Sequence, residues 1–192
     1  MNKVDKCIEI LNKGGIVIFP TDTAFGIGCR IDKVEAIQKL FKIRKRPISQ
    51  ATPVLVSSID MAKEYFANIP KDVEEKLIKK YWPGALTIVL PVKENKVNDL
   101  VTGGSKSIGI RMPNNLNVLK IIEGVGVPIL GPSANLHGEK TPYKIEELDI
   151  SLVDQVDYVL DEKAGGLEAS TVIDCSQKPW KILRNGAIDI SI

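Results

Sequence analysis

The stretch GGIVIFPTDTAFGIG, residues 14–28, decides both the fold of this chain and the position of its site. Its apolar run IVIF, residues 16–19, is typical of a buried strand, and Pro20 ends the run because proline has no N–H to give to a sheet. Two threonines and an aspartate, residues 21–23, follow where the strand leaves the core. Polar side chains at such an exit either satisfy the backbone of their own loop or face a ligand, so the rest of the sequence must distinguish the two.

The composition is that of one globular domain, which we expect to span residues 1–192. The chain is 44% hydrophobic and 26% charged, and its net charge of +2 is too small to indicate a nucleic-acid-binding protein by itself. No apolar run approaches the roughly 18 residues that a membrane span needs, so we expect a cytoplasmic protein without a membrane partner. Cys7, Cys29 and Cys175 are odd in number and contain no C-x-x-C pair, which favours three buried thiols over a disulfide frame or a zinc site.

Helical and strand patterns alternate along the chain. The helical patterns cover residues 4–11, 32–46, 59–66, 70–80 and 115–123, with Gly14-Gly15 as the C-terminal cap of the first and Asp32 as the N-terminal cap of the second. The strand patterns cover residues 16–19, 53–57, 85–91, 107–112, 127–131, 156–161, 170–175 and 180–184. This alternation predicts an α/β fold with a mixed sheet. Residues 95–106, NKVNDLVTGGSK, read as a mobile surface loop.

The densest positive charge lies in KLFKIRKRP, residues 39–47. A solvated helix face is the preferred interpretation for Lys39 and Lys42. Arg44 and Arg46 instead crowd the last turn before a proline, and guanidinium groups match the geometry of phosphate oxygens. A phosphate site or a nucleic-acid site therefore remains open at this turn.

The segment GPSANLHG, residues 131–138, follows a predicted strand directly. Ser133 and Asn135 would point to one side of an extended chain and present a hydroxyl and an amide together to a ligand. The alternative is a turn in which these side chains cap their own loop. A serine nucleophile is disfavoured, because the G-x-S-x-G elbow is absent and the single histidine, His137, lies too close in sequence to suggest a triad.

Arg111 and Arg184 each end a predicted strand. Such arginines commonly form surface ion pairs, but together with Arg44 and Arg46 they could line one crevice that attracts an anion of several charges. Neither the Walker A pattern nor the G-x-G-x-x-G pattern occurs, and the acidic pairs lack the spacing of a metal site.

Seven ordered motifs complete the pattern: PTDTAFGIG, KIRKRP, YWPGALTIVL, SIGIRMP, GPSANLHG, STVID and ILRNGAI. From about Gly14 to Ile188 the chain resembles the YrdC-like domain, the threonylcarbamoyl-AMP synthase family, in its single-domain bacterial form. The resemblance implies a twisted mixed β-sheet with flanking helices around a basic cavity. It also implies a nucleotidyltransferase that joins L-threonine, bicarbonate or CO2, and ATP into threonylcarbamoyl-adenylate and pyrophosphate.

That product would pass to downstream threonylcarbamoyl-transferase proteins, which build N6-threonylcarbamoyladenosine at position 37 of tRNA. By match of motif, the resemblance assigns threonine contacts to Thr23, Arg111 and Ser170. It assigns ATP contacts to Arg44, Arg46, Ser107, Ser133, Asn135, Thr141 and Arg184. We take Arg44 and Arg46 as the catalytic candidates and expect Mg²⁺ to arrive with ATP, held by phosphate oxygens and water rather than by a protein metal site.

Two other readings remain open for the same residues. A basic cavity would also suit a non-catalytic module that grips double-stranded RNA or tRNA through its phosphates, although the low net charge and the few aromatic residues argue against it. The second alternative is a relative that keeps the fold but has lost the synthase activity. The loop at residues 95–106 is either a lid over the reacting groups or an ordinary surface loop.

Overall fold

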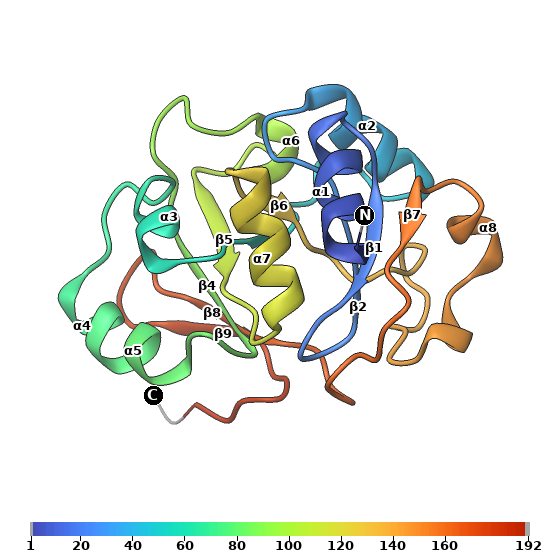
Figure 1. Cartoon of the computed structure of the whole chain (residues 1–192). Helices are drawn as coiled ribbons and strands as arrows, with labels where there is room; N and C mark the ends of the chain where they lie inside the picture. The colour runs from blue at the N-terminus through green and yellow to red at the C-terminus, as the bar shows by residue number, and fades with distance from the viewer. Residues whose placement is uncertain (1, 191–192) are drawn as a thin grey trace.

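The computed structural model describes residues 2–190, whose strands form two mixed sheets (Figure 1). The three-stranded sheet has the order β2-β1-β7, and the six-stranded sheet has the order β6-β3-β5-β4-β8-β9. The strands of the first are β1 (Val17–Pro20), β2 (Phe25–Gly28) and β7 (Tyr158–Val159). Those of the second are β3 (Val54–Leu55), β4 (Leu86–Pro91), β5 (Ser107–Arg111), β6 (Ile129–Leu130), β8 (Thr171–Asp174) and β9 (Lys181–Arg184). The prediction of an α/β fold with mixed strand pairing is confirmed.

The opening stretch of sequence forms an antiparallel hairpin of β1 and β2. Val17 pairs with Gly28 and Pro20 pairs with Phe25, so residues 21–24 form the connection. The hairpin is joined to the second sheet by the isolated bridges Gly26–Ser133 and Arg30–Ile129. The sequence allows this close approach because a Cβ atom at Gly28 would lie 2.3 Å from the carbonyl oxygen of Leu130. The loop that leaves β1 is therefore held at the seam between the two sheets.

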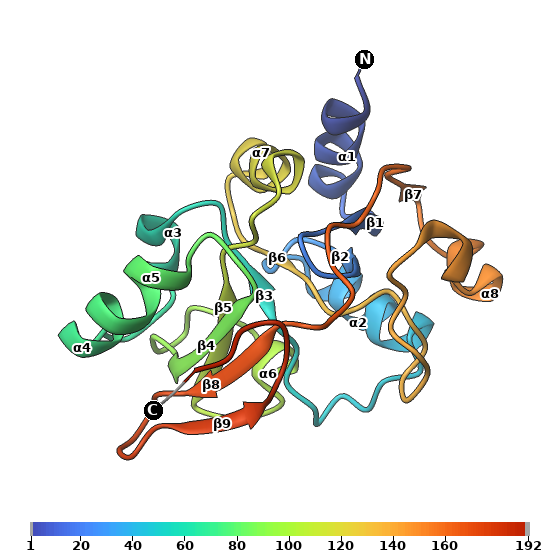
Figure 2. The same ribbon diagram turned by 90° about the horizontal axis from the view of Figure 1, so that it is seen from below.

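Helices cover these sheets in short segments. They are α1 (Lys3–Asn12), α2 (Val34–Ile43), α3 (Ile59–Lys63), α4 (Lys71–Val73), α5 (Lys79–Tyr81), α6 (Asp99–Thr102), α7 (Leu116–Val125) and α8 (Ile150–Val153), with a π-helical turn at Glu74–Ile78 and a 3-10 turn at Ile145–Glu147. Helices α1 and α7 pack on each other, and Figure 2 shows them on the same side of the molecule. Gly14 closes α1 with a φ of 84°, and Gly15 donates to the carbonyl of Ile10, as the predicted cap requires. Within residues 2–190, no helix has the length and apolar character that crossing a membrane requires.

Two expectations about local structure are wrong. Asp32 does not cap α2, because the residue at the cap position is Lys33 and the Asp32 carboxylate instead pairs with Arg30 at 2.7 Å. The predicted mobile loop at residues 95–106 contains α6, which buries Val101 and accepts a hydrogen bond from the backbone of Thr52 at 3.0 Å. The sequence pattern did not reveal this helical turn, because Leu100 and Val101 are surrounded by polar residues.

The three cysteines are free and buried, as predicted. Burial raises the pKa of the Cys7 thiol to about 11 and the pKa values of Cys29 and Cys175 to about 12. Since the thiolate is the reactive form, native protein at pH 8 should resist an aromatic disulfide reagent for hours and react fully once it is unfolded in guanidinium chloride. Rapid labelling of native protein, followed by the absorbance of the released thiol, would contradict this expectation.

Candidate functional site

A recess, called here the central hollow, lies at the seam between the two sheets and has a volume of about 150 Å³. Its walls come from the loop after β1, the end of α2, the ends of β5 and β9, and the segment after β6. The lining residues are Thr21, Thr23, Ala24, Phe25, Gly26, Arg44, Arg46, Pro53, Arg111, Gly131, Pro132, Ser133, Thr141, Ala169, Ser170 and Arg184. Four arginines and no aspartate or glutamate occur among these residues. The central hollow is therefore strongly positive and suits an anion.

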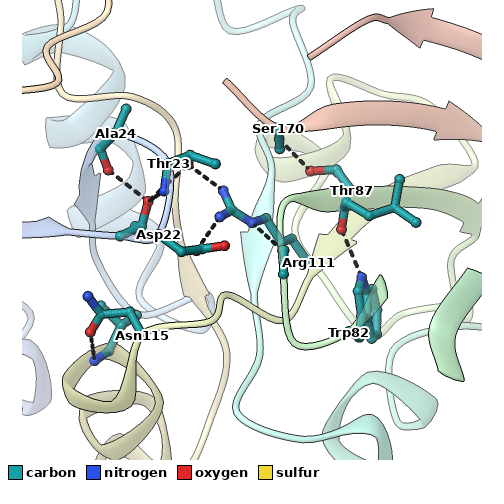
Figure 3. A network of polar contacts seen from close by, with 12 residues as sticks. Asp22, Thr23, Ala24, Trp82, Thr87, Arg111, Asn115 and Ser170 are labelled. Atoms are coloured by element: carbon teal, nitrogen blue, oxygen red, sulfur yellow. Dashed lines mark hydrogen bonds and ion pairs between the residues drawn. The ribbon is translucent and has the colours of Figure 1, made fainter. Parts of the chain in front are cut away.

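Arg111, the last residue of β5, points toward the hairpin loop (Figure 3). Its Nη1 donates to the hydroxyl of Thr23 at 2.8 Å, its Nη2 binds the carboxylate of Asp22, and its Nε donates to the carbonyl of Gly84 at 2.9 Å. Burial lowers the pKa of Arg111 below its ordinary value, and Asp22 acts in the opposite direction. One N–H on each terminal nitrogen remains available for a ligand, because a guanidinium has five N–H donors.

Arg184 ends β9 and approaches the central hollow from the other side. Its Nε donates to the backbone carbonyl of Ser170 and its Nη2 donates to the Ser170 hydroxyl, both at 2.9 Å. The same hydroxyl lies 3.0 Å from the Thr87 hydroxyl, which belongs to β4. Burial lowers the pKa of Arg184 below its usual range. The adjacent strands β4, β8 and β9 therefore position this part of the wall together.

Arg44 and Arg46 enter the central hollow because α2 ends in a left-handed turn between them. Lys45 has a φ of 51°, and the amide of Arg46 donates back to the carbonyl of Phe41 at 2.9 Å, which is the hydrogen bond of a Schellman motif. This turn brings the residues on both sides of Lys45 toward the same recess. The local sequence thus places two guanidinium groups together at one helix end.

These two arginines have different surroundings. Arg44 is only 3% exposed and donates from Nε to the backbone carbonyl of Asn135 at 3.1 Å and from Nη2 to its side-chain oxygen at 3.4 Å. Burial, together with the neighbouring charge of Arg46, lowers the pKa of Arg44 to about 10. Arg46 donates from Nη2 to the carbonyl of Ala51 at 2.6 Å, and its Nε has no partner among the described residues. Arg44 is mainly bonded to the protein, whereas Arg46 keeps most of its donors for a ligand.

In the segment after β6, only one of the two predicted ligand contacts, Ser133, faces the central hollow, while Asn135 bonds to its own loop. The amide nitrogen of Asn135 donates to the carbonyls of Leu136 and Glu139 at 2.9 and 2.8 Å, so this side chain satisfies its own loop, as the alternative in the sequence allowed. Ser133 donates to the side-chain oxygen of Asn135 at 2.5 Å and lines the central hollow. Asn135 therefore supports Arg44 from behind the wall.

The predicted site residues converge with two exceptions. The central hollow contains Thr23, Arg44, Arg46, Arg111, Ser133, Thr141, Ser170 and Arg184. Asn135 lies behind this wall. Ser107 does not line the hollow, because it begins β5 and Arg111 ends it, about 13 Å away at the usual rise of a strand.

Sequence reasoning missed Asp22 and Thr87. In the sequence, Asp22 was assigned only to the polar loop after the first strand, yet its carboxylate is the partner of Arg111. An acidic partner offsets the cost of burying a guanidinium, so an aspartate next to a proposed ligand contact was the available signal. Thr87 was the one polar side chain in the apolar strand pattern ALTIVLP, a weaker signal. No group of three or more histidine, cysteine, aspartate or glutamate side chains within residues 2–190 has the arrangement of a metal site.

The fold and the central hollow define a mixed α/β protein with an arginine-lined recess between two sheets. Residues 9–186 match the Sua5_yciO_yrdC family model, described as "Telomere recombination". The chain belongs to this Sua5, YciO and YrdC family.

Comparison with individual proteins places the chain in the same family. The chain is 31% identical over 187 residues to the threonylcarbamoyl-AMP synthase of Bacillus subtilis, an alignment that covers 97% of this chain and 54% of that protein. The structure of Pyrococcus abyssi Sua5 complexed with L-threonine superposes with a TM-score of 0.90 at 31% identity, covering 96% of this chain and 54% of that one. The structure of Escherichia coli YciO superposes with a TM-score of 0.87 at 27% identity, covering 97% and 90%. The chain therefore spans about half the length of the first two relatives and most of the length of the third.

Proposed function

We propose that this chain is a threonylcarbamoyl-AMP synthase, which converts L-threonine, bicarbonate and ATP into threonylcarbamoyl-adenylate and pyrophosphate. The observation that carries the proposal is the convergence of four arginines, from three segments distant in sequence, on one recess that also presents threonine and serine hydroxyls. The B. subtilis relative bears the name of this enzyme, and the P. abyssi relative is a complex with L-threonine. The adenylate would then supply the transferases that modify adenosine 37 of tRNA.

The walls of the central hollow divide into two proposed subsites. Arg111, Thr23 and Ser170 would hold the amino acid. Arg46 and Arg184, with Ser133 and Thr141, would hold the phosphates of ATP. The volume of about 150 Å³ suits an amino acid and the reacting phosphate, because recesses that enclose a whole drug-sized ligand measure roughly 300–1,000 Å³. The nucleoside of ATP would therefore extend beyond the central hollow.

The proposed chemistry is limited by repulsion between anions. The amine of threonine combines with bicarbonate to form a carbamate and water, and a carbamate oxygen then attacks the α-phosphorus of ATP and displaces pyrophosphate. An anionic nucleophile must approach a polyanion, so fixed positive charge and positioning contribute most of the rate enhancement. Arg46 and Arg184 supply that charge, and Arg44 contributes its remaining Nη1 while it holds the loop of Asn135. No covalent enzyme intermediate is required.

Magnesium would enter this reaction as part of the nucleotide. The lining of the central hollow includes no carboxylate, and hard divalent cations prefer carboxylate and phosphate oxygens. The described walls therefore do not form a protein site for Mg²⁺. Phosphate oxygens and water would hold the ion.

Release of pyrophosphate tests the proposal directly. Purified protein with ATP, L-threonine and bicarbonate should release pyrophosphate and form a product with the mass of threonylcarbamoyl-adenylate, and omission of any one component should abolish both. Pyrophosphate release that does not depend on threonine would reject the proposal. Binding of tRNA without any pyrophosphate would instead support the non-catalytic RNA module considered from the sequence.

A further inference from the structure

The Thr23 hydroxyl faces the central hollow, but its proton is already donated to the neighbouring hydroxyl of Thr21. Thr21 Oγ1 donates its single proton to the carbonyl of Ala24 at 2.7 Å and accepts from the backbone N–H of Thr23 at 3.1 Å. It also lies 3.0 Å from Thr23 Oγ1. Because the Thr21 proton is used, the proton between these two hydroxyls must belong to Thr23. Thr23 Oγ1 also accepts from Arg111, so toward a ligand it can only accept one more hydrogen bond.

The Ser170 hydroxyl on the opposite wall has the reverse hydrogen-bonding role: it can donate to a ligand rather than accept from it. It accepts from Nη2 of Arg184 at 2.9 Å and lies 3.0 Å from Thr87 Oγ1. Thr87 is 3% exposed, and Ser170 is the one hydrogen-bond partner that its hydroxyl has among the described residues. If Ser170 donated to Thr87, the Thr87 proton would be buried without an acceptor, which is unfavourable because it loses its hydrogen bond to water and gains none in return. Thr87 therefore donates to Ser170, which fills the acceptor capacity of Ser170 and leaves its own proton facing the central hollow.

We propose that Thr21 and Thr87 are positioning residues that fix the hydrogen-bond direction of the two ligand-facing hydroxyls, making Thr23 an acceptor and Ser170 a donor. The inference rests on the proposed function and deepens it by defining the ligand. A molecule bound between these hydroxyls must give a donor, such as an ammonium or hydroxyl group, to Thr23. It must give an acceptor, such as a carboxylate or carbamate oxygen, to Ser170. A small hydroxylated amino acid has both groups and fits this pair in one orientation.

Isosteric replacement separates this role from simple packing. Thr21→Val and Thr87→Val keep the shape of each side chain but remove its hydroxyl, so the dissociation constant for L-threonine, measured by calorimetry, should rise about 3- to 10-fold in each variant. Thr21→Ser and Thr87→Ser keep the hydroxyl and should restore an affinity within twofold of the parent. The KM for threonine should follow the dissociation constant, while the KM for ATP and the kcat at saturating threonine change less than twofold.

The control is Thr102→Val in α6, another buried threonine, whose hydroxyl donates to the carbonyl of Asp99 outside the central hollow. It should leave the affinity for threonine unchanged. Valine variants of Thr21 and Thr87 that bind threonine as tightly as the parent would overturn the inference. If a valine variant fails to fold, NMR of the parent protein decides. The hydroxyl protons of Thr21 and Thr87 should then exchange slowly and show NOEs to Ala24 and Ser170 respectively, whereas rapid exchange would overturn the inference.

The outcomes for the inference and for the proposed function are distinguishable. Parent protein that binds threonine with the expected variant pattern but releases no pyrophosphate would refute the synthase and support the fixed polarity. Parent protein that releases pyrophosphate while both valine variants keep their threonine affinity would support the synthase and refute the fixed polarity. Parent protein that does not bind threonine would refute both.

Discussion

Arg46→Ala should lower kcat/KM for pyrophosphate release about 100- to 1,000-fold, which corresponds to roughly 2.7–4 kcal/mol of lost transition-state stabilisation. Arg46 is the cation of the central hollow that the protein satisfies least, because its Nη2 binds the Ala51 carbonyl and its Nε has no partner among residues 2–190. Its remaining N–H donors are therefore available to the phosphates of ATP when the carbamate approaches the α-phosphorus. Steady-state rates over a range of ATP and threonine concentrations measure the effect.

A nearby cation provides the matched control for Arg46→Ala. Lys42 lies in the last turn of α2, four residues before Arg46, but it is exposed and does not line the central hollow. Lys42→Ala removes the same formal charge and should change the rate less than twofold, whereas Arg46→Lys should give an intermediate rate, because an ammonium keeps the charge without the planar fork. Turnover near that of the parent in Arg46→Ala would remove this residue from the catalytic machinery.

Asp22→Ala should lower the free energy of unfolding by about 3–5 kcal/mol, because it leaves the Arg111 guanidinium buried without its counterion. The Asp22 and Arg111 side chains are 15% and 7% exposed, and Arg184 adds repulsion at the same place. Urea denaturation followed by circular dichroism gives the difference directly. The effect arises from an unpaired charge rather than from lost packing, so Arg111→Met in the same chain should recover much of the stability.

An exposed ion pair provides the comparison. Asp60 pairs with Lys63 at 3.4 Å, and the Asp60 side chain is 93% exposed. Asp60→Ala should change the free energy of unfolding by less than about 1 kcal/mol, because solvent screens such pairs. A loss at Asp22 no larger than the loss at Asp60 would show that the Asp22–Arg111 pair is solvated in solution.

Much of the architecture was readable from local patterns. The apolar runs around β1, β4, β5 and β8 are long enough, and bounded clearly enough, that strand period and turn residues identify them. The four arginines were also predictable as one set, since each follows a strand or helix end where side chains meet at the edge of a sheet. The division of the strands into two sheets was not predictable, because it depends on how β2 meets the segment around β6, a pairing between residues distant in sequence.

The missed contacts have a common physical cause. A sequence shows that Asp22 is acidic but not that it lies beside Arg111, and it shows that Thr87 is polar but not that its hydroxyl meets Ser170. Such contacts depend on register between strands that local periodicity does not determine. The error at residues 95–106 differs, because two apolar residues were outweighed by polar neighbours although burial of one turn sufficed to anchor the segment.

The order in which the strands pair has a consequence for synthesis on the ribosome. β1 cannot pair with its parallel partner β7, and β4 cannot pair with β8, until those later strands have been synthesised. A nascent chain that ends before residue 158 therefore leaves one edge of β1 and one edge of β4 without a hydrogen-bonded neighbour. Open edges invite pairing with other polypeptides, which makes this stage the one at which chaperones matter most. Arg184 is the last of the four arginines to be synthesised, so the wall of the central hollow is complete only after the strands that close those edges have been made.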